Sequence, residues 1–196
     1  DLGCGAGRHL DVLRRTNPLA FGMDLSPTLL RMAPAPLHPW LLQGDMRQLP
    51  VKEETLSGAC LWFTPFGYFA DAENRQLMAA LGHRLRPGGV LVLDYLNADH
   101  VQRTLVPEDT LVRAGVRAVN RRTLEGDRLV KRMELTRLDT GATRQALESI
   151  RLYHPAELDE MAARAGLRLR KVMGSYAGGA FTADSPRWIG LFERAR

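Results

Sequence analysis

Short apolar runs alternate with amphipathic stretches through the first half of the chain. This pattern is typical of a parallel β-sheet whose faces are covered by helices. The apolar runs predict strands at residues 19–23, 38–42, 56–63 and 90–95. Helical periodicity between these runs predicts helices at residues 8–15, 26–32 and 72–85. The first half of the chain therefore favours an α/β, doubly wound, Rossmann-like domain.

The second half of the chain has a different pattern. From about residue 110 to residue 152, apolar and polar residues tend to alternate, and glycines at positions 126 and 141 interrupt the alternation. Such a pattern predicts a small antiparallel sheet of two to four strands. A helix at 155–165 and strands at 167–173 and 188–193 complete the chain. We therefore expect one domain, residues 1–196, with an antiparallel β insert at residues 103–152 that acts as a lid or as a homodimer surface.

Length and composition agree with one globular domain. The chain has 196 residues, of which 45% are hydrophobic. No apolar run approaches the roughly 20 residues of a membrane span, and the first residues do not resemble a signal peptide. Only Cys4 and Cys60 are present, so a disulfide framework is excluded and a reducing, cytoplasmic location is expected. No Cys or His cluster has the spacing of a zinc site, so no metal is expected.

The net charge of +5 raises the question of a nucleic-acid partner. Arginine supplies 24 of the 27 basic residues, and these arginines are spread along the chain. Scattered basic residues are more typical of solvated faces than of a nucleic-acid patch. The charge therefore gives little support to a nucleic-acid partner, and no membrane partner is expected.

A glycine-rich turn opens the chain, with the sequence Asp1-Leu2-Gly3-Cys4-Gly5-Ala6-Gly7-Arg8. Glycines at alternate positions let the backbone bend tightly and approach a ligand, and the next helix aims free N–H groups at it. A dinucleotide-binding turn needs G-x-G-x-x-G, but Arg8 stands where the third glycine would be. Because such a turn normally follows a buried strand, we expect a first strand that this sequence lacks.

This opening segment resembles the first motif of the class I S-adenosylmethionine (SAM)-dependent methyltransferases. Four later segments match the family in order over roughly residues 1 to 96: Gly22–Ser26, Gly44–Met46, Leu61–Thr64 and Leu85–Leu91. They resemble the ends of the second, third and fourth strands and the turn into the fifth strand. The resemblance implies SAM as cofactor and S-adenosylhomocysteine (SAH) as product. It also implies a seven-stranded, mainly parallel sheet whose last strand is antiparallel.

The resemblance assigns the parts of the cofactor to individual residues. Asp1 would attract the α-ammonium of SAM, and the glycines would make room for its methionine part. Asp24 would bind both ribose hydroxyls, a task that suits an acceptor-only carboxylate. Asp45 would meet the adenine amino group, and Phe63 would lie beside the methionine part. The expected cofactor-binding residues are Asp1, Gly3, Gly5, Gly7, Asp24, Leu25, Asp45, Met46 and Phe63.

Methyl transfer from a sulfonium is an in-line displacement, so the protein needs chiefly to align donor and acceptor. A general base is needed only if the acceptor must lose a proton. The candidate bases are Tyr68, Tyr95, His9 and His154. We predict Tyr68, within the aromatic segment Phe63–Phe69, and His154 as the catalytic residues, although His154 before Pro155 also suits a helix cap.

The acceptor is less constrained by the sequence than the cofactor. Enzymes of this type that methylate amide or adenine amines carry Asp/Asn-Pro-Pro-Tyr/Phe after the fourth strand, whereas this chain has Phe63-Thr64-Pro65-Phe66. This difference puts methylation of amide or adenine amines in doubt. The compact core with an antiparallel insert after the fifth strand resembles small-molecule methyltransferases, and this resemblance implies an N or O of a small molecule as the acceptor. The alternatives are an RNA or peptide methyltransferase and a non-catalytic SAM-binding regulator. A nucleotide-binding oxidoreductase would need glycine in place of Arg8.

Overall fold

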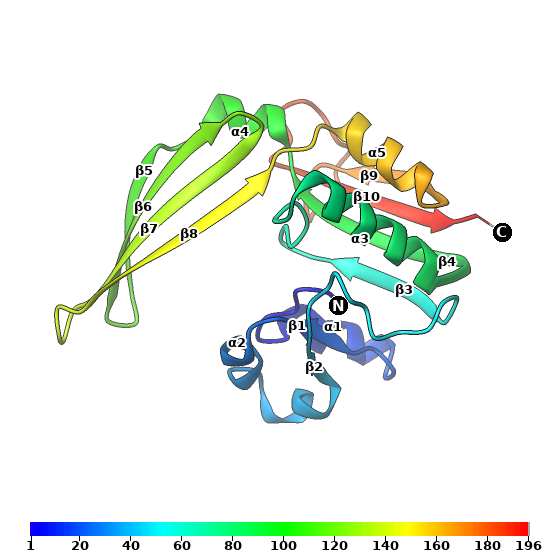
Figure 1. The fold of residues 1–196 in the computed structure, drawn as a ribbon, viewed down its shortest axis with the longest axis horizontal. Helices are drawn as coiled ribbons and strands as arrows, with labels where there is room; N and C mark the ends of the chain where they lie inside the picture. The colour runs from blue at the N-terminus through cyan, green and yellow to red at the C-terminus, as the bar shows by residue number, and fades with distance from the viewer. Residues whose placement is uncertain (196) are drawn as a thin grey trace.

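The computed structural model describes residues 1–195. The core contains two sheets side by side (Figure 1). In the first, β1 (Gly22–Asp24) pairs in parallel with β2 (Leu41–Gln43). In the second, the strand order is β3 (Leu56–Leu61), β4 (Leu85–Leu96), β10 (Arg187–Arg194) and β9 (Leu167–Met173). β3 is parallel to β4, whereas β10 is antiparallel to both of its neighbours, as the resemblance implied for the last strand.

A third, antiparallel sheet extends away from this core (Figure 1). Its four strands follow one another in order: β5 (Glu108–Arg113), β6 (Val116–Glu125), β7 (Arg128–Arg137) and β8 (Thr143–Arg151). The alternating pattern of the second half therefore predicted the antiparallel type of this sheet. We refer to it as the lid sheet, after one of the two roles predicted for it.

The helices of the core follow the predicted periodicity closely. They are α1 (Arg8–Thr16), α2 (Pro27–Arg31), α3 (Asp71–Arg84), α4 (Ala98–Thr104) and α5 (Pro155–Arg164), together with a 3-10 helix, η1 (Ala35–Trp40). Ser26 caps α2, because its side chain accepts a hydrogen bond from the N–H of Leu29, and Pro27 occupies the first helical position. Helix α4 was not predicted, and η1 replaces the first part of the strand expected at 38–42. Pro39 lacks the N–H that a strand would use, so β2 begins only at Leu41.

The expected seven-stranded sheet is not formed as one continuous sheet. Within residues 1–195, the two core sheets are joined through Leu2, which forms a parallel bridge with Met23 and donates its N–H to the Cys60 carbonyl at 2.9 Å. A single bridging residue cannot make a ladder of paired strands between β1 and β3. The predicted class of fold is therefore confirmed, whereas the two core sheets do not clearly form the single seven-stranded sheet that was expected.

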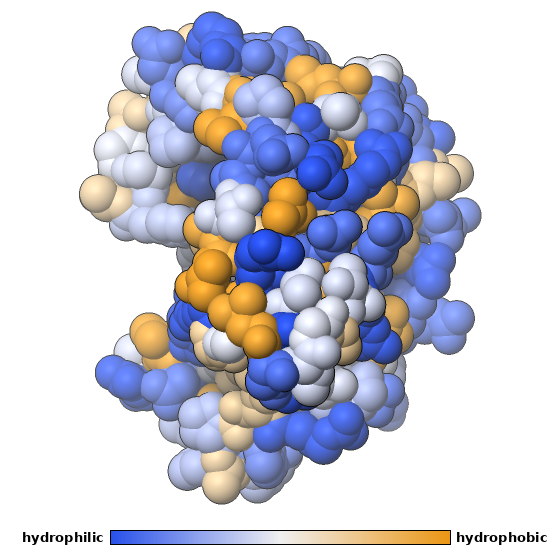
Figure 2. Space-filling model, turned by 90° about the vertical axis from the view of Figure 1, so that its left-hand side faces the viewer, coloured by the Kyte–Doolittle hydropathy of each residue, from blue (hydrophilic) through white to orange (hydrophobic). Residues whose placement is uncertain are grey.

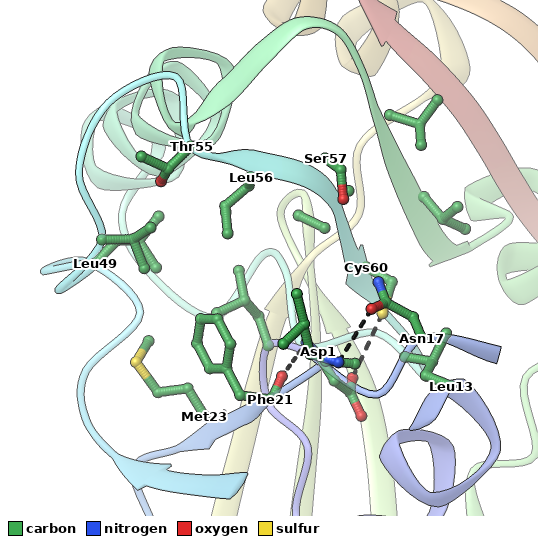
Figure 3. Close-up of a pocket in the computed structure, with 18 of the residues that line it drawn as sticks. Asp1, Leu13, Asn17, Phe21, Met23, Leu49, Thr55, Leu56, Ser57 and Cys60 are labelled. Atoms are coloured by element: carbon green, nitrogen blue, oxygen red, sulfur yellow. Dashed lines mark hydrogen bonds between the residues drawn. The ribbon is translucent and has the colours of Figure 1, made fainter. Parts of the chain in front are cut away.

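An apolar cavity of about 470 Å³ lies between β1 and β3, next to this bridge. Figure 3 shows side chains such as Phe21, Leu49 and Leu56 pointing into it. Its lining runs along β3 from Leu56 to Cys60 and includes Phe21 before β1 and Asp1 at the start of the glycine turn.

The main core lies between the second sheet and helices α3 and α5, which contact each other (Figure 1). Its largest fully buried side chains include Trp188, Phe192, Tyr95 and Phe66. Burial of each large apolar side chain stabilises the folded state by roughly 1.5–3 kcal/mol. The packing of this cluster therefore holds the ends of the strands in place. No helix among the described residues is both long enough and apolar enough to cross a membrane.

Candidate active site

The glycine turn has the backbone that its sequence predicts. Gly3, Gly5 and Gly7 all have left-handed φ angles, of +71°, +54° and +77°. A Cβ at Gly3 would lie 2.7 Å from Cβ of Pro65, and one at Gly7 would lie 2.8 Å from a methyl carbon of Leu37. Both the φ angle and the lack of space therefore require glycine here. The turn leads directly into α1, whose first N–H groups point back at it.

Three segments that the sequence analysis placed at strand ends come together at Gly3. Pro65 follows β3, and Met46 follows β2, with its Cε 3.6 Å from the position of a Gly3 Cβ. Gly3 and Cys4 donate their N–H groups to the carbonyl of Met23 in β1. The carboxyl edge of the core is therefore one compact site, as expected for strands of an open α/β sheet.

Asp24, at the end of β1, holds the glycine turn in place. Its Oδ2 accepts the N–H of Gly5 at 2.8 Å, and its Oδ1 accepts the N–H of Ser26 at 2.8 Å. Each carboxylate oxygen has a second lone pair, so Asp24 can still accept a further hydroxyl hydrogen on each. Leu25, the next residue, is exposed and can cover a bound ligand. The geometry allows a ribose-binding role for Asp24 and adds a structural role that the sequence analysis did not foresee.

Asp1 meets a simple test of whether a cationic ligand group fits the site. Its Oδ2 is buried and has no hydrogen-bond partner, while its Oδ1 lies 3.8 Å from Sγ of Cys60 (Figure 3). A buried carboxylate oxygen without a partner is destabilising by roughly 1–3 kcal/mol or more, so a donor is expected there. The α-ammonium of SAM is a donor of the right charge, and the adjoining glycines leave space for the rest of the amino acid.

Asp45 is engaged by a neighbour instead of facing open space. Arg47 donates from Nε to Oδ1 at 3.1 Å and from Nη2 to Oδ2 at 2.7 Å, and its Nη1 donates to Glu73 at 2.6 Å. Hydrogen bonding from Arg47 lowers the pKa of Asp45, which stays ionised. The guanidinium of Arg47 also lies over the ring of Phe69. Adenine could reach Asp45 only as an additional partner, so this assignment stays a prediction, as does that of Met46.

The end of β3 has an unusual backbone. Phe63 and Thr64 are consecutive non-glycine residues with φ of +66° each. The N–H of Phe63 bonds to Oδ2 of Asp94 at 2.7 Å, and the N–H of Thr64 bonds to the Asp94 carbonyl at 3.2 Å. The ring of Phe63 is 64% exposed, so it can contact a ligand at this edge. Sequence analysis missed Asp94, although a lone acid within the apolar run 90–95 was a visible signal.

The predicted catalytic residues lie in different surroundings. Tyr68 is partly exposed in the loop after β3, and burial together with the charge of Glu148 raises its pKa. His154 immediately precedes α5, where its N–H bonds to Glu157 at 2.8 Å and its ring lies 3.4 Å from Asp99. His154 thus has a clear structural function at the helix start, and catalysis by either residue stays a prediction.

The two remaining candidate bases also differ in access. Tyr95 is fully buried and its hydroxyl donates to the Arg151 carbonyl, so it is structural. His9 stacks near Trp62 with ring centroids 5.8 Å apart. Burial, followed by the charge of Arg8, lowers the pKa of His9, which keeps its ring neutral near pH 7. His9 is therefore the better placed of the two.

The lid sheet is attached to the loop that contains Tyr68. Arg128, at the start of β7, donates hydrogen bonds to the carbonyls of Gly67, Tyr68 and Phe69 at 3.2–3.3 Å. Seen from the lid-sheet side, the surface is hollowed between the upper and lower parts of the molecule, with apolar residues along the hollow (Figure 2). A role of the lid sheet beside a bound acceptor stays a prediction.

Comparisons with known proteins agree with this geometry. Residues 1–89 match the model of a methyltransferase domain family. CalS10, a SAM-bound amino pentose methyltransferase from Micromonospora echinaspora, is 27% identical, with a TM-score of 0.72 over 100% of this chain and 82% of that chain. DesVI from Streptomyces venezuelae is also 27% identical, with a TM-score of 0.70 over the same shares.

The fold is also that of the CcbJ methyltransferase from Streptomyces caelestis, which is 22% identical with a TM-score of 0.83 over 100% of this chain and 82% of that chain. The comparison with curated proteins found no significant match. The fold, the glycine turn and the family match over residues 1–89 together make the chain similar to the class I SAM-dependent methyltransferases and indicate an enzyme that uses SAM.

Proposed function

We propose that this protein transfers a methyl group from SAM to a nitrogen or oxygen of a small, polar acceptor such as an amino sugar. The observation that carries the proposal is the wall that the lid sheet presents beside Tyr68. The charge of Glu148 in β8 adds to the effect of burial in raising the pKa of Tyr68. Lys131 is the cross-strand neighbour of Glu148, and its Nζ lies 3.4 Å from Oε2 of Glu148. Asp109, Asn120 and Arg122 continue this polar row on the same face.

A row of mixed charges suits a polar acceptor better than an apolar one. Asn120 is buried, and Arg122 and Lys131 are only 21% and 26% exposed, so their charges are partly shielded from water. Partly shielded charges make stronger hydrogen bonds than fully solvated ones. The structures of similar fold include a sugar N-methyltransferase, KedS8, and the amino pentose methyltransferase CalS10, which supports an amino sugar as the first acceptor to test.

The chain's own residues would bind and orient the reactants. When bound, the cofactor supplies a methyl group on a positively charged sulfur, which is already activated for displacement. Asp24 would hold the ribose, Asp1 the ammonium, and the glycine turn the amino acid part of the cofactor. Tyr68 would orient the acceptor, and alignment of this kind can supply about 7–11 kcal/mol. We further propose that the lid sheet closes one side of the acceptor site.

The proposal is tested by measuring SAH release with a panel of acceptors. Amino sugars, simple sugars, short peptides and structured RNA are offered at equal concentration, together with SAM. Turnover with amino sugars, and none with RNA or peptide, supports the proposal. Turnover confined to RNA or peptide would show that the acceptor class is wrong. Saturable SAM binding without turnover on any acceptor would instead favour a SAM-binding regulator.

A further inference from the structure

The turn after β3 has a conformation that the surrounding structure must maintain. Phe63 and Thr64 both lie in the left-handed region, which non-glycine residues adopt only at a cost in free energy. Pro65 packs against Gly3, so this turn also forms part of the boundary of the glycine turn. A strained backbone in contact with a ligand-binding turn raises the question of what holds it there.

Asp94 of β4 is the group that holds this turn. Its side chain is fully buried, and its carboxylate accepts from the Phe63 N–H at 2.7 Å. Its other oxygen accepts from Nε of Arg187 at 2.7 Å, and Arg187 also donates to Oγ1 of Thr64 at 2.7 Å. Both residues of the strained turn are therefore bonded directly to this buried ion pair. Arg187 is 13% exposed, so loss of the Asp94 charge would leave a cation without its counter-ion.

Tyr176 brings a third segment to the same carboxylate. It lies between β9 and β10, and its hydroxyl donates to Oδ2 of Asp94 at 2.6 Å although its ring is 57% exposed. The guanidinium of Arg187 lies 5.6 Å from the ring centroid of Phe63 and 6.0 Å from that of Tyr176. Two exposed aromatic rings therefore flank one buried ion pair. Together they form an outward-facing wall next to the glycine turn.

We propose that Asp94 is a positioning residue for methyl transfer, which sets the Phe63 turn against the methionine end of SAM and ties the loop of residues 174–186 to it through Tyr176. This inference rests on the proposed function, since it takes Phe63 to lie beside the methionine part of the cofactor. Asp94 itself touches no reactant, because it is fully buried beneath the turn. Its effect is therefore expected on the amino acid end of the cofactor, and not on the adenosine end.

Two related ligands separate these ends. SAH carries the amino acid part, whereas 5′-methylthioadenosine has the same adenosine and sulfur without it. Calorimetry with the Asp94→Asn variant is expected to show SAH binding about tenfold weaker, because the Phe63 turn loses the charge-assisted hydrogen bond that positions it. Binding of 5′-methylthioadenosine is expected to stay within about twofold of wild type. The positioning role would be overturned if Asp94→Asn bound both ligands as the wild type does, or if it weakened the binding of both by the same factor. Wild-type protein that binds neither ligand would contradict the proposed function itself.

Tyr176→Phe tests the loop and keeps the proposal open to refutation if Asp94→Asn does not fold. This variant keeps the ring beside Arg187 and removes only the hydroxyl that reaches Asp94. Hydrogen–deuterium exchange across residues 174–186 is expected to rise in Tyr176→Phe, and SAH affinity is expected to fall by a smaller factor than in Asp94→Asn. Asp184→Asn is the matched control, because Asp184 lies in the same loop, is 94% exposed and pairs only with Arg103 at the surface among the contacts described. Exchange equal to wild type in Tyr176→Phe would overturn the proposed tie.

Discussion

Gly3 and Gly141 have nearly the same backbone angle, with φ of +71° and +70°, but their surroundings differ completely. A Cβ at Gly3 would lie 2.7 Å from Pro65, whereas nothing lies within 4 Å of one at Gly141. Gly141 needs only the freedom of its backbone to close a hairpin of the lid sheet. Gly3 needs that freedom and also the empty space. The cofactor region is thus built by close approach of the backbone, and the lid sheet is not.

Most ion pairs within the lid sheet differ in the same way from the buried pair of the core. Arg121–Glu108, Arg132–Glu125 and Arg137–Asp139 are about half-exposed, and even the less exposed Arg122–Asp109 pair is 21% and 34% exposed. Such pairs contribute little, roughly 0–1 kcal/mol each. The Asp94–Arg187 pair of the core is almost completely buried, so breaking it is strongly destabilising. Substitutions of similar chemistry should therefore have large effects in the core and small effects in the lid sheet.

The largest expected effect is that of Gly3→Ala compared with Gly141→Ala. A methyl group at Gly3 displaces Pro65 and the turn, so SAM binding and turnover should fall by about 100-fold or more. Gly141→Ala should bind SAM as the wild type does and lose only about 1–2 kcal/mol of unfolding free energy, the cost of a left-handed alanine. Calorimetry and thermal unfolding of both variants measure the difference. Equal SAM affinity in the two variants would refute the contrast between the two regions.

A second comparison sets Asp24→Ala against Asp139→Ala. Removal of the Asp24 carboxylate leaves the N–H groups of Gly5 and Ser26 without acceptors and removes the expected ribose ligand. SAM affinity should fall by about 10- to 100-fold, as expected for lost charge-assisted hydrogen bonds. Asp139 pairs only at the surface of the lid sheet, so its removal should leave SAM affinity unchanged. Titration calorimetry measures the SAM affinity of both variants. Unaltered SAM binding in Asp24→Ala would rule out the ribose assignment.

The attachment of the lid sheet is tested by Arg128→Ala, with Arg132→Ala as its control on the same strand and face. Arg128 bonds to three carbonyls of the loop at Tyr68, whereas Arg132 pairs at the surface with Glu125. Arg128→Ala should raise the KM for the acceptor about tenfold and leave SAM affinity within about twofold. Arg132→Ala should change neither value. Steady-state kinetics with whichever acceptor is identified first measure both values. A fall in SAM affinity alone would contradict the role of the lid sheet.

The smallest effect is expected from the pH dependence of Asp45. Arg47 lowers the pKa of Asp45 below its ordinary value, so the folded state favours the ionised carboxylate. Its stabilising contribution is therefore present above the ordinary pKa of about 3.9 and is lost as the pH falls through the lower folded value. Thermal unfolding between pH 2 and pH 6 should show a slightly shallower acid decline for Asp45→Asn than for wild type. Identical slopes would show that this exposed pair contributes nothing to stability.

The features that sequence predicted best are local in origin. The glycine turn, the start of α2 and the alternation of the lid sheet each depend on residues within one turn or strand, such as Ser26 and Gly3. In an open α/β fold, the carboxyl ends of the parallel strands lie at one edge of the sheet. The segments that follow the strands were therefore expected to meet at one site. Asp94 was not recognised because its partners, Arg187 and Tyr176, are more than 80 residues away along the chain. Its position in an apolar run gave only a weak sign of a buried charge.

The sequence by itself determined the class of fold, the glycine turn and the acids at the strand ends. These depend on backbone freedom and on the periodicity of apolar residues, which act over short distances. Only the tertiary structure decided that Leu2 bridges the two core sheets, that Arg47 engages Asp45, and that Asp94 holds the Phe63 turn. Such choices of partner depend on which segments burial brings together, because a charge removed from water must find a counter-ion wherever the fold supplies one.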